Sequence, residues 1–413
     1  MLRLARALWI AVAAAVVLIA GALPVSATSS DVYVGSVEGP VSVPGDNILH
    51  GIGGIVLPAG TWWVTATAVI DAGDNGTPGS GQSTCELIAD DGSFSYRLDQ
   101  ATWALLGHPE GRAVDNVYLT ATFMDSLVST LSLECSSEIQ SVSVSDLVMS
   151  AASVSANASP MFKENGANSA SIAGGSGFHT VGSLSLPKGK WLIVAKANIV
   201  SSSSSQTTNE VCQLKLSTTD VDQSGQSMYY TTQQGYEGEA AVQVAHVFAS
   251  AGSAALQCKG KQAAAANHIV LIGIKAGKLT RKPFGGTAST SGTGTPTIVS
   301  GYKAGSVAIS AGSYGTIGSL ALPAGKWLVQ AKAFLKDGSE VRVDCQLTLG
   351  TMNDLTYSLG AAAGHTTGLY MQTAASLSSS GNAIFSCDAA STGPSVSYVR
   401  ITAISASLLS FAI

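Results

Sequence analysis

Leu57-Pro58-Ala59-Gly60-Thr61-Trp62 is the first of three copies of one stretch, Leu-Pro-x-Gly-x-Trp. The other two are Leu186-Pro187-Lys188-Gly189-Lys190-Trp191 and Leu322-Pro323-Ala324-Gly325-Lys326-Trp327. The three prolines are 129 and 136 residues apart, which is the length of a small domain. Solenoid and propeller repeats recur every 20 to 50 residues, roughly, which is much shorter than this spacing. The spacing therefore predicts three tandem copies of one compact fold.

The residues that follow each glycine alternate between two faces. One face of the first copy carries Trp62, Val64, Ala66, Ala68 and Ile70. The pattern recurs in the other copies, at Trp191, Ile193, Ala195, Ala197 and Ile199 and at Trp327, Val329, Ala331, Ala333 and Leu335. A period of two predicts a half-buried strand. We expect its tryptophan to pack in a core rather than to stack on a sugar.

The opposite face of this strand is mixed. It carries Lys196 and Lys332 at equivalent places and Thr67 in the first copy. Trp63 lies on this face too, where the other copies have leucine. We therefore expect Trp63 to be an exposed aromatic side chain that could contact a ligand.

The six cysteines are distributed two per copy. They are Cys85 and Cys135, Cys212 and Cys258, and Cys345 and Cys387. Repetition favours a disulfide within each copy, and export would make disulfides the expected state. Six buried thiols are the alternative. A zinc site is disfavoured, because no Cys-x-x-Cys or paired histidines accompany these cysteines.

Strand-like segments of the third copy predict an all-β fold. They lie near residues 306–310, 315–322, 326–336, 340–349, 354–359, 367–377, 382–388 and 396–409. Short strands at this density, without helical periodicity, predict three tandem antiparallel jelly-roll-like β-sandwiches. The expected division is a signal peptide at 1–27, repeat 1 at 31–156, repeat 2 at 157–280, a Gly/Ser/Thr linker at 281–297 and repeat 3 at 298–413. The composition of the linker predicts flexibility.

The first 27 residues resemble a secretory signal peptide. Arg3 and Arg6 precede an apolar stretch at residues 11–21, and Val25-Ser26-Ala27 forms a small-x-small cleavage site. The alternative is a retained membrane anchor, but a spanning helix needs about 20 apolar residues. We expect cleavage, a secreted or cell-surface protein, and no membrane span after cleavage.

The charge of the chain argues against nucleic acid as a partner. Removal of Arg3 and Arg6 would take the formal net charge from −5 to −7. Charged residues make up 11% of the chain against about 25% in ordinary soluble domains. A weakly charged surface associates easily, which favours a protein that forms an assembly or lies against a cell wall.

The strand entered through Pro58, Gly60 and Trp62 resembles the Pro-x-x-Gly-aromatic strand of tumour-necrosis-factor-like and complement-type globular heads. It is similar also to the Leu-Pro-Ala-Gly strands of exported jelly-roll repeats in high-GC Gram-positive bacteria. The resemblance implies interaction rather than catalysis, and association in threes. We therefore expect the three covalently joined copies to pack as an intramolecular pseudo-trimer rather than as separate beads.

Few residues suggest a ligand. Tyr229, Tyr230 and Tyr357 could line a carbohydrate surface, although tyrosine is common on sandwich faces. Residues 220–225 begin like a calcium loop, but Thr231 stands where an EF-hand has its glutamate. Asp71, Asp74 and Asn75 form a second oxygen-rich turn, and such residues also simply make turns. We expect no cofactor, with calcium as the alternative.

The sequence predicts no enzyme. It shows no Gly-x-Ser-x-Gly elbow, few acids per copy and no acid that recurs at equivalent positions. The expected function is a secreted, non-enzymatic surface or extracellular-matrix protein, acting by binding or assembly through sandwich faces and loops. Its partner would be a protein, a cell-wall glycan surface or itself. The alternative is a lectin-like carbohydrate-binding protein.

Overall fold

The computed structural model describes residues 31–412 apart from 38, 73–80, 106–113, 139–140, 155–160, 165–168, 202–207, 217–220, 229–235, 285, 292, 337–341 and 360–365. The described residues form strands, turns and bends and no helix, so none of them makes a helix able to cross a membrane. The predicted signal peptide at 1–27 lies outside the described residues.

Repeat 1 consists of two facing antiparallel sheets. Its inner sheet, which faces the other repeats, has the order β1-β9-β4-β7, with β2 beside β9, and its outer sheet has the order β3-β8-β5-β6. The strands are β1 Asp31–Val37, β2 Val41–Val43, β3 His50–Leu57, β4 Gly60–Asp71, β5 Gly81–Asp90, β6 Ser95–Leu105, β7 Val114–Asp125, β8 Ser129–Ser137 and β9 Val142–Ser153.

Repeat 2 has the same arrangement. Its inner sheet runs β10-β18-β13-β16, with β11 beside β18, and its outer sheet runs β12-β17-β14-β15. The strands are β10 Met161–Glu164, β11 Ser169–Ile172, β12 His179–Leu186, β13 Gly189–Ser201, β14 Thr208–Leu216, β15 Val221–Met228, β16 Tyr236–Phe248, β17 Gly252–Gly260 and β18 Ala264–Lys275.

Repeat 3 follows with an inner sheet β21-β29-β24-β27, with β22 beside β29, and an outer sheet β23-β28-β25-β26. The strands are β21 Thr297–Lys303, β22 Val307–Ala308, β23 Gly315–Leu322, β24 Gly325–Lys336, β25 Arg342–Leu349, β26 Met352–Leu359, β27 Thr366–Leu377, β28 Gly381–Ala389 and β29 Ser395–Ala406. Three further strands lie between or after the repeats: β19 Lys278–Pro283, β20 Ser289–Ser291 and β30 Leu408–Ala412.

The strand order identifies each repeat as a jelly roll. In repeat 1 the chain alternates between sheets so that its first strand, β1, lies beside its last, β9, in the inner sheet. Apart from the short β2, the outer sheet likewise pairs the second strand, β3, with the second-last, β8, and repeats 2 and 3 show the same order. This interleaving of antiparallel strands is the double Greek key of a jelly roll and confirms the predicted fold class.

The Leu-Pro-x-Gly-x-Trp stretch forms the turn that leads into the third main strand of each repeat. The Trp62 indole donates a hydrogen bond to the Pro58 carbonyl oxygen at 3.0 Å, and Trp191 and Trp327 repeat this contact with Pro187 and Pro323. A Cβ on Gly189 would lie 2.9 Å from the Trp191 indole nitrogen, which explains the glycine. All three tryptophans lie in the cores of their own repeats.

The predicted disulfides are confirmed. Cys85–Cys135, Cys212–Cys258 and Cys345–Cys387 each join directly opposed residues on adjacent strands of an outer sheet, with Cα atoms 4.0 to 4.1 Å apart. Closing loops of 42 to 50 residues stabilises each repeat by about 4 kcal/mol in the chain-entropy account.

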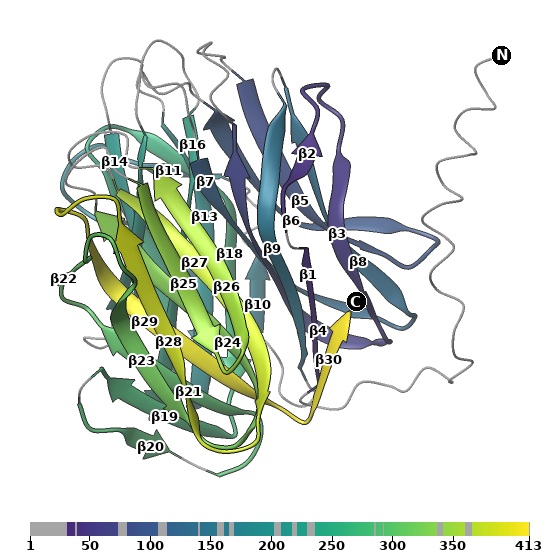
Figure 1. The fold of residues 1–413 in the computed structure, drawn as a ribbon, viewed down its shortest axis with the longest axis vertical. Helices are drawn as coiled ribbons and strands as arrows, with labels where there is room; N and C mark the ends of the chain where they lie inside the picture. Colours follow the sequence, from purple (N-terminus) through teal and green to yellow (C-terminus); the bar gives the residue numbers. More distant parts are fainter. Residues whose placement is uncertain are drawn as a thin grey trace.

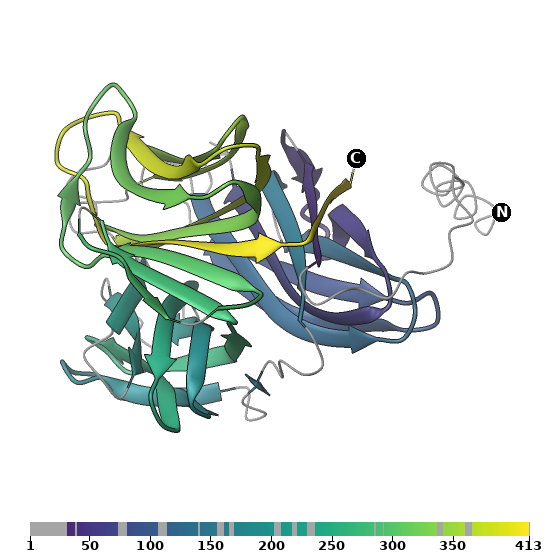
Figure 2. The same ribbon diagram turned by 90° about the horizontal axis from the view of Figure 1, so that it is seen from below.

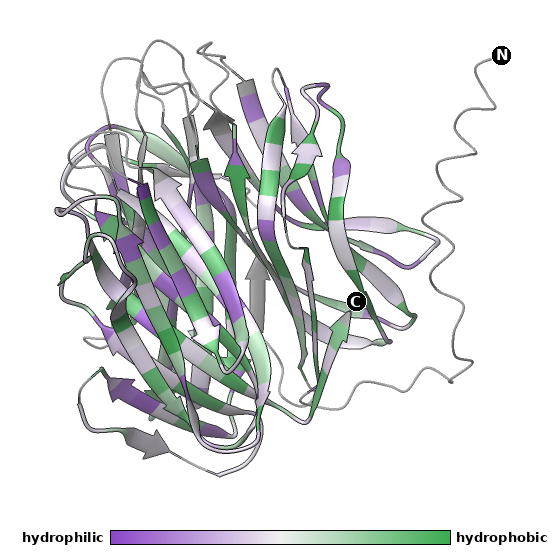
Figure 3. Ribbon diagram, viewed as in Figure 1, coloured by the Kyte–Doolittle hydropathy of each residue, from purple (hydrophilic) through white to green (hydrophobic). Residues whose placement is uncertain are grey.

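The strand after the tryptophan is buried on both faces, so the expectation of a half-buried strand is wrong. Every residue of β4 from Trp62 to Asp71 is buried, and Lys196 on β13 is 0% exposed. Apolar and polar residues do alternate along the strands (Figure 3). The mixed face, however, contacts the neighbouring repeats instead of water.

The three repeats form a closed ring. After repeat 2, β19 pairs in parallel with β21, the first strand of repeat 3. After repeat 3, β30 pairs in parallel with β1, the first strand of repeat 1, and so joins repeat 3 to repeat 1 (Figure 1). Seen from below, the three sandwiches surround a common centre (Figure 2). The structure thus has the pseudo-trimeric arrangement rather than separate beads.

Residues 281–297 do not form the free linker that their composition suggested. β19 ends at Pro283, β20 pairs with β19, and β21 already begins at Thr297. Leu279 and Ile298 are buried between repeats, and this burial holds the segment in place. The first strand of repeat 3 therefore lies before the predicted 306–310, and the predicted strand 396–409 is two strands, β29 and β30.

Deletion of residues 408–413 tests the closure of the ring. It would expose the backbone edge of β1 and remove Leu409 from the inter-repeat contacts. We expect a loss of about 1–2 kcal/mol in the free energy of unfolding and self-association through the open edge. Urea unfolding and light scattering measure the two effects.

Phe411→Ser is the matched control, because its side chain is 44% exposed and the backbone pairing stays. It should change the urea midpoint little. Equal stability of the deleted and full-length chains would show that β30 does not hold the ring.

Candidate functional site at the junctions of the repeats

An apolar cluster built from all three repeats fills the centre of the ring. Trp63, Leu192 and Leu328 occupy equivalent positions in it, three residues after the glycine of each turn, in line with the shared register of their strands. Trp63 is 1% exposed, and its indole nitrogen donates to Thr120 Oγ1 at 3.0 Å. The expectation of an exposed Trp63 is therefore wrong, because the face away from its own core is covered by the other repeats.

Two tyrosines meet where the inner sheets converge. Tyr118, Ala241 and Tyr370 occupy equivalent positions, and the rings of Tyr118 and Tyr370 lie 5.2 Å apart. The Tyr370 hydroxyl accepts a hydrogen bond from the Ala241 backbone N–H at 2.8 Å and shares one with Ser224 at 2.6 Å. Both phenols are fully buried, and this desolvation raises the pKa of each well above 10.

One aspartate recurs at an equivalent position in all three repeats. Asp99, Asp222 and Asp354 each lie opposite the leucine that follows the first cysteine by two residues. Each carboxylate accepts a backbone N–H from the edge strand of its own inner sheet, at Thr120, Gln243 and Gln372 respectively. The expectation that no acid recurs is therefore wrong. These side chains satisfy edge-strand donors that the ladder leaves unpaired.

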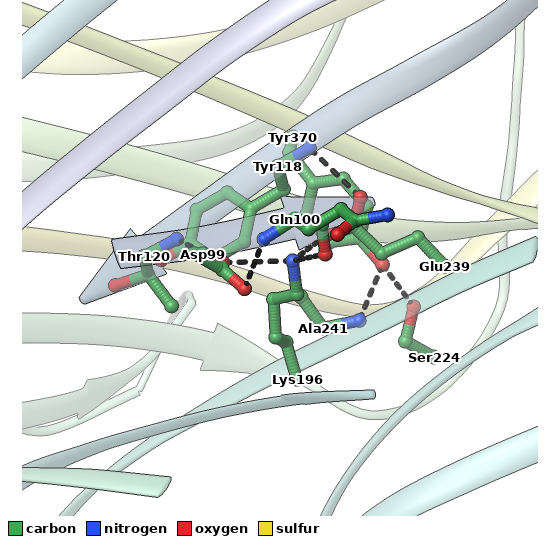
Figure 4. A network of polar contacts seen from close by, with 9 residues as sticks. All are labelled: Asp99, Gln100, Tyr118, Thr120, Lys196, Ser224, Glu239, Ala241 and Tyr370. Atoms are coloured by element: carbon green, nitrogen blue, oxygen red, sulfur yellow. Dashed lines mark hydrogen bonds and ion pairs between the residues drawn. The ribbon is translucent and has the colours of Figure 1, made fainter. Parts of the chain in front are cut away.

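At the junction of repeats 1 and 2, one ammonium group faces two carboxyl groups (Figure 4). Lys196 Nζ lies 2.8 Å from Asp99 Oδ2 and 3.9 Å from Glu239 Oε1, and it also donates to the Gln100 carbonyl oxygen. Burial raises the pKa of both acids, that of Glu239 to about 8. Asp99, the nearer acid, forms the ion pair with the Lys196 ammonium group. Glu239 keeps its proton near neutral pH.

At the junction of repeats 2 and 3, two cations face one carboxylate. Lys332 Nζ lies 3.0 Å from Asp222 Oδ2, and Arg400 Nε lies 3.2 Å from Asp222 Oδ1. Lys332 also donates to the Gln223 carbonyl oxygen. Burial lowers the pKa of Lys332 to about 8, against the opposing effect of Asp222. Lys196 and Lys332 thus make the same contacts to the preceding repeat.

At the junction of repeats 3 and 1, a neutral amide takes the central place. Gln372 is 0% exposed and donates to the carbonyl oxygens of Thr65 and Val148. Its own oxygen accepts from the hydroxyls of Thr65 and Ser150 at 2.6 and 2.8 Å. Here Thr67 stands at the position of the two lysines, so no lysine reaches Asp354 from repeat 1.

The other residues singled out from the sequence do not gather into one site. Tyr357 is half-buried at the same junction, where its hydroxyl donates to Asp71 at 3.1 Å and its ring lies under Arg342. Tyr229, Tyr230, Asp220, Thr231, Asp74 and Asn75 lie outside the described residues. Asp222 of the calcium-like loop binds Lys332 and Arg400 instead. Across the described part of the chain, no three His, Cys, Asp or Glu side chains cluster as metal ligands would.

Sequence reasoning missed the aspartates and the junctions that they build. The signal for the lysines was present, because both stand five residues after their tryptophan. The signal for the aspartates was hidden, because they follow the first cysteine of each repeat by 14, 10 and 9 residues. The hairpins between the two positions differ in length, and only the strand register aligns them.

No protein-family model and no curated protein matches the chain. Among solved structures, the chain is similar to one described as the triple jelly roll fold and turret assembly in an archaeal virus. The two are 10% identical, the match covers 91% of this chain and 92% of that chain, and the TM-score is 0.19. A likeness at this level carries no argument, and the fold rests on the strand order.

The buried Glu239 predicts that stability falls as the pH rises from about 5 to about 8. In the unfolded chain this carboxyl group loses its proton near pH 4.5, whereas in the folded protein it keeps the proton to about pH 8. The folded state binds more protons in this window, so raising the pH favours unfolding. Glu239→Gln is neutral in both states and should flatten the dependence of the urea midpoint on pH.

Part of the slope should remain in Glu239→Gln, because burial also raises the pKa of Glu210 to about 7. Glu134→Gln on the outer sheet is the control and should keep the full slope. An unchanged slope in Glu239→Gln would contradict the assignment of a proton to Glu239.

Proposed function

We propose that the protein is an exported, non-enzymatic surface or matrix protein that acts by binding or assembly through the outer parts of its sandwiches. Three disulfides are consistent with an oxidising compartment outside the cytoplasm. The buried ionisable groups described above contact the backbone and side chains of neighbouring repeats, so their chemistry holds the ring together. The surfaces left for a partner are the outer sheets and their turns.

The observation that carries this proposal is an exposed apolar end of repeat 1. We define this apolar end as Val56, Phe94, Tyr96, Met124, Leu127 and Val128, which are 47% to 80% exposed. The strand register brings these residues to the same end of the sandwich, since Val56 and Asp90 both lie opposite Thr130 and Asp90 lies opposite Ser95. Concentrated exposed apolar side chains mark interaction sites on soluble proteins.

The most exposed residue of this apolar end has less exposed or polar counterparts in the other repeats. Met124 is 80% exposed, whereas its counterpart in repeat 2, Val247, is 38% exposed and its counterpart in repeat 3 is Ser376. We propose that the apolar end of repeat 1 contacts a second copy of the chain, which would remove these exposed side chains from water.

The lectin alternative has less support from the described residues. Trp63 is buried between repeats, and the Tyr357 hydroxyl and ring are engaged by Asp71 and Arg342. Among the described residues singled out for a sugar surface, neither therefore presents a free aromatic face.

Sedimentation velocity over a range of concentrations tests the self-association. We expect reversible oligomers in the wild-type chain and at least a tenfold increase in the dissociation constant, about 1.4 kcal/mol, for the triple variant Met124→Ser/Leu127→Ser/Val128→Ser. Ile48→Ser is the control, because Ile48 is 59% exposed but precedes the opposite end of β3.

A glycan array run in parallel separates the two functions. Saturable binding to one glycan by a strictly monomeric chain would favour the lectin and contradict the proposal. Oligomers that persist unchanged in the triple variant would show that assembly uses another surface.

A further inference from the structure

The three junctions of the ring share one recurring aspartate, but among the described residues only two of these aspartates have a cation beside them. Asp99 accepts the backbone N–H groups of Gln100 and Thr120, and Asp354 accepts those of Leu355 and Gln372. Asp99 is paired with an ammonium group at 2.8 Å, and Asp222 with one at 3.0 Å. Asp354 is 4% exposed, and no Lys, Arg or His in the described part of the chain pairs with it.

A second carboxylate faces the same junction. Asp146 lies in the bulge of β9, at a backbone position that has a positive φ in every repeat and is His268 in repeat 2 and Tyr398 in repeat 3. Its Oδ2 accepts a hydrogen bond from the Ser145 hydroxyl. The charge of Asp146 adds to burial, the larger cause, in raising the pKa of Asp354 well above 3.8. Asp354 thus lies near a second acid, whereas Asp99 and Asp222 each lie beside a cation.

The two aspartates line a cavity of about 410 Å³ between repeats 3 and 1. Asn353 and Leu355 of β26 contribute from repeat 3, and Val148 of β9 contributes from repeat 1. The exposed Met352 and Leu355 lie at its margin, where the cavity opens to solvent. The volume is that of a small organic molecule and far exceeds what a single metal ion requires.

The two junctions that contain a lysine show which chemical group fits beside the recurring aspartate. Lys196 and Lys332 each place an ammonium group against the carboxylate and against the carbonyl oxygen of the next residue, Gln100 or Gln223. Leu355 is the equivalent next residue at the third junction, and it lines the cavity. An ammonium group on a short aliphatic stem would complete the arrangement that the chain itself builds twice.

We propose that the cavity at the junction of repeats 3 and 1 binds a small organic amine, whose ammonium group takes the place of the missing lysine beside Asp354 and Asp146. The aliphatic part of the ligand contacts Val148 and Leu355. This binding site is independent of the apolar end of repeat 1 and of self-association.

Isothermal titration of the exported chain with n-butylamine hydrochloride tests the site, because this amine reproduces the lysine side chain. We expect saturable binding of one amine per chain with a dissociation constant of about 1 mM or tighter, and no binding of neutral n-butanol. Asp354→Asn should weaken binding at least about tenfold, since it removes the carboxyl group that would pair with the ammonium group. Thr67→Lys should abolish binding, because the ammonium group of the new lysine would itself pair with Asp354.

Glu134→Gln, on the outer sheet of repeat 1, is the matched control and should bind the amine as the wild type does. A thermal melt of each variant, with and without the amine, separates loss of binding from loss of folding. The amine should raise the melting temperature of the wild type and of Glu134→Gln but not that of a folded Thr67→Lys chain.

Three results would overturn the proposal. They are no binding by the wild type, equal binding by the wild type and Thr67→Lys, and binding of calcium chloride but not of the amine. A blocked Ala-Lys-Ala peptide presents the same ammonium group on a chain. Binding of that peptide without binding of n-butylamine would assign the cavity to a protein partner and overturn the assignment to a small amine.

Discussion

Burial of both faces of one strand per repeat is the constraint on which the ring depends. β4, β13 and β24 pack one face into their own sandwich and the other against the neighbouring repeats. A face that contacts another repeat must be apolar or must satisfy each of its polar groups, because an unpaired buried polar group costs several kcal/mol, about 2–7 by transfer data. The pairing of Lys196, Lys332 and Gln372 at the junctions therefore follows from the same burial that covers the leucines beside them.

The junctions meet this requirement with different chemistry. Two use an ion pair, Lys196 with Asp99 and Lys332 with Asp222, and the third uses the amide of Gln372. Buried ion pairs add little net stability, because the loss of hydration offsets the attraction. We infer that they set which faces meet: an aspartate on the outer edge strand of one repeat matches a lysine on the inner sheet of the next. The apolar cluster supplies the stability, and the polar groups determine which repeat faces pack together.

The jelly rolls could be predicted from the sequence because their causes are local. Alternation along the strand of Trp327 and the two cysteines of each copy act within one repeat, and both appear at fixed places in the chain. The junctions could not be predicted in the same way. Alternation places Trp63 away from its own core, but it cannot distinguish water from another repeat. The equivalence of Asp99 and Asp354 emerges only when strand register removes the differences in hairpin length.

Joining three repeats in one chain lets the junctions differ. In a homotrimer every substitution occurs at all three interfaces, so replacing the buried lysine would leave three aspartates without a cation. In this chain the change to Thr67 affects one junction, and Asp99 and Asp222 keep their partners. That junction is also the one where β30 meets β1, so backbone pairing and the Gln372 network hold it without an ion pair. The pseudo-symmetry thus supplies the rigid frame, and the departure at Thr67 leaves Asp354, which lines the cavity, without a lysine partner.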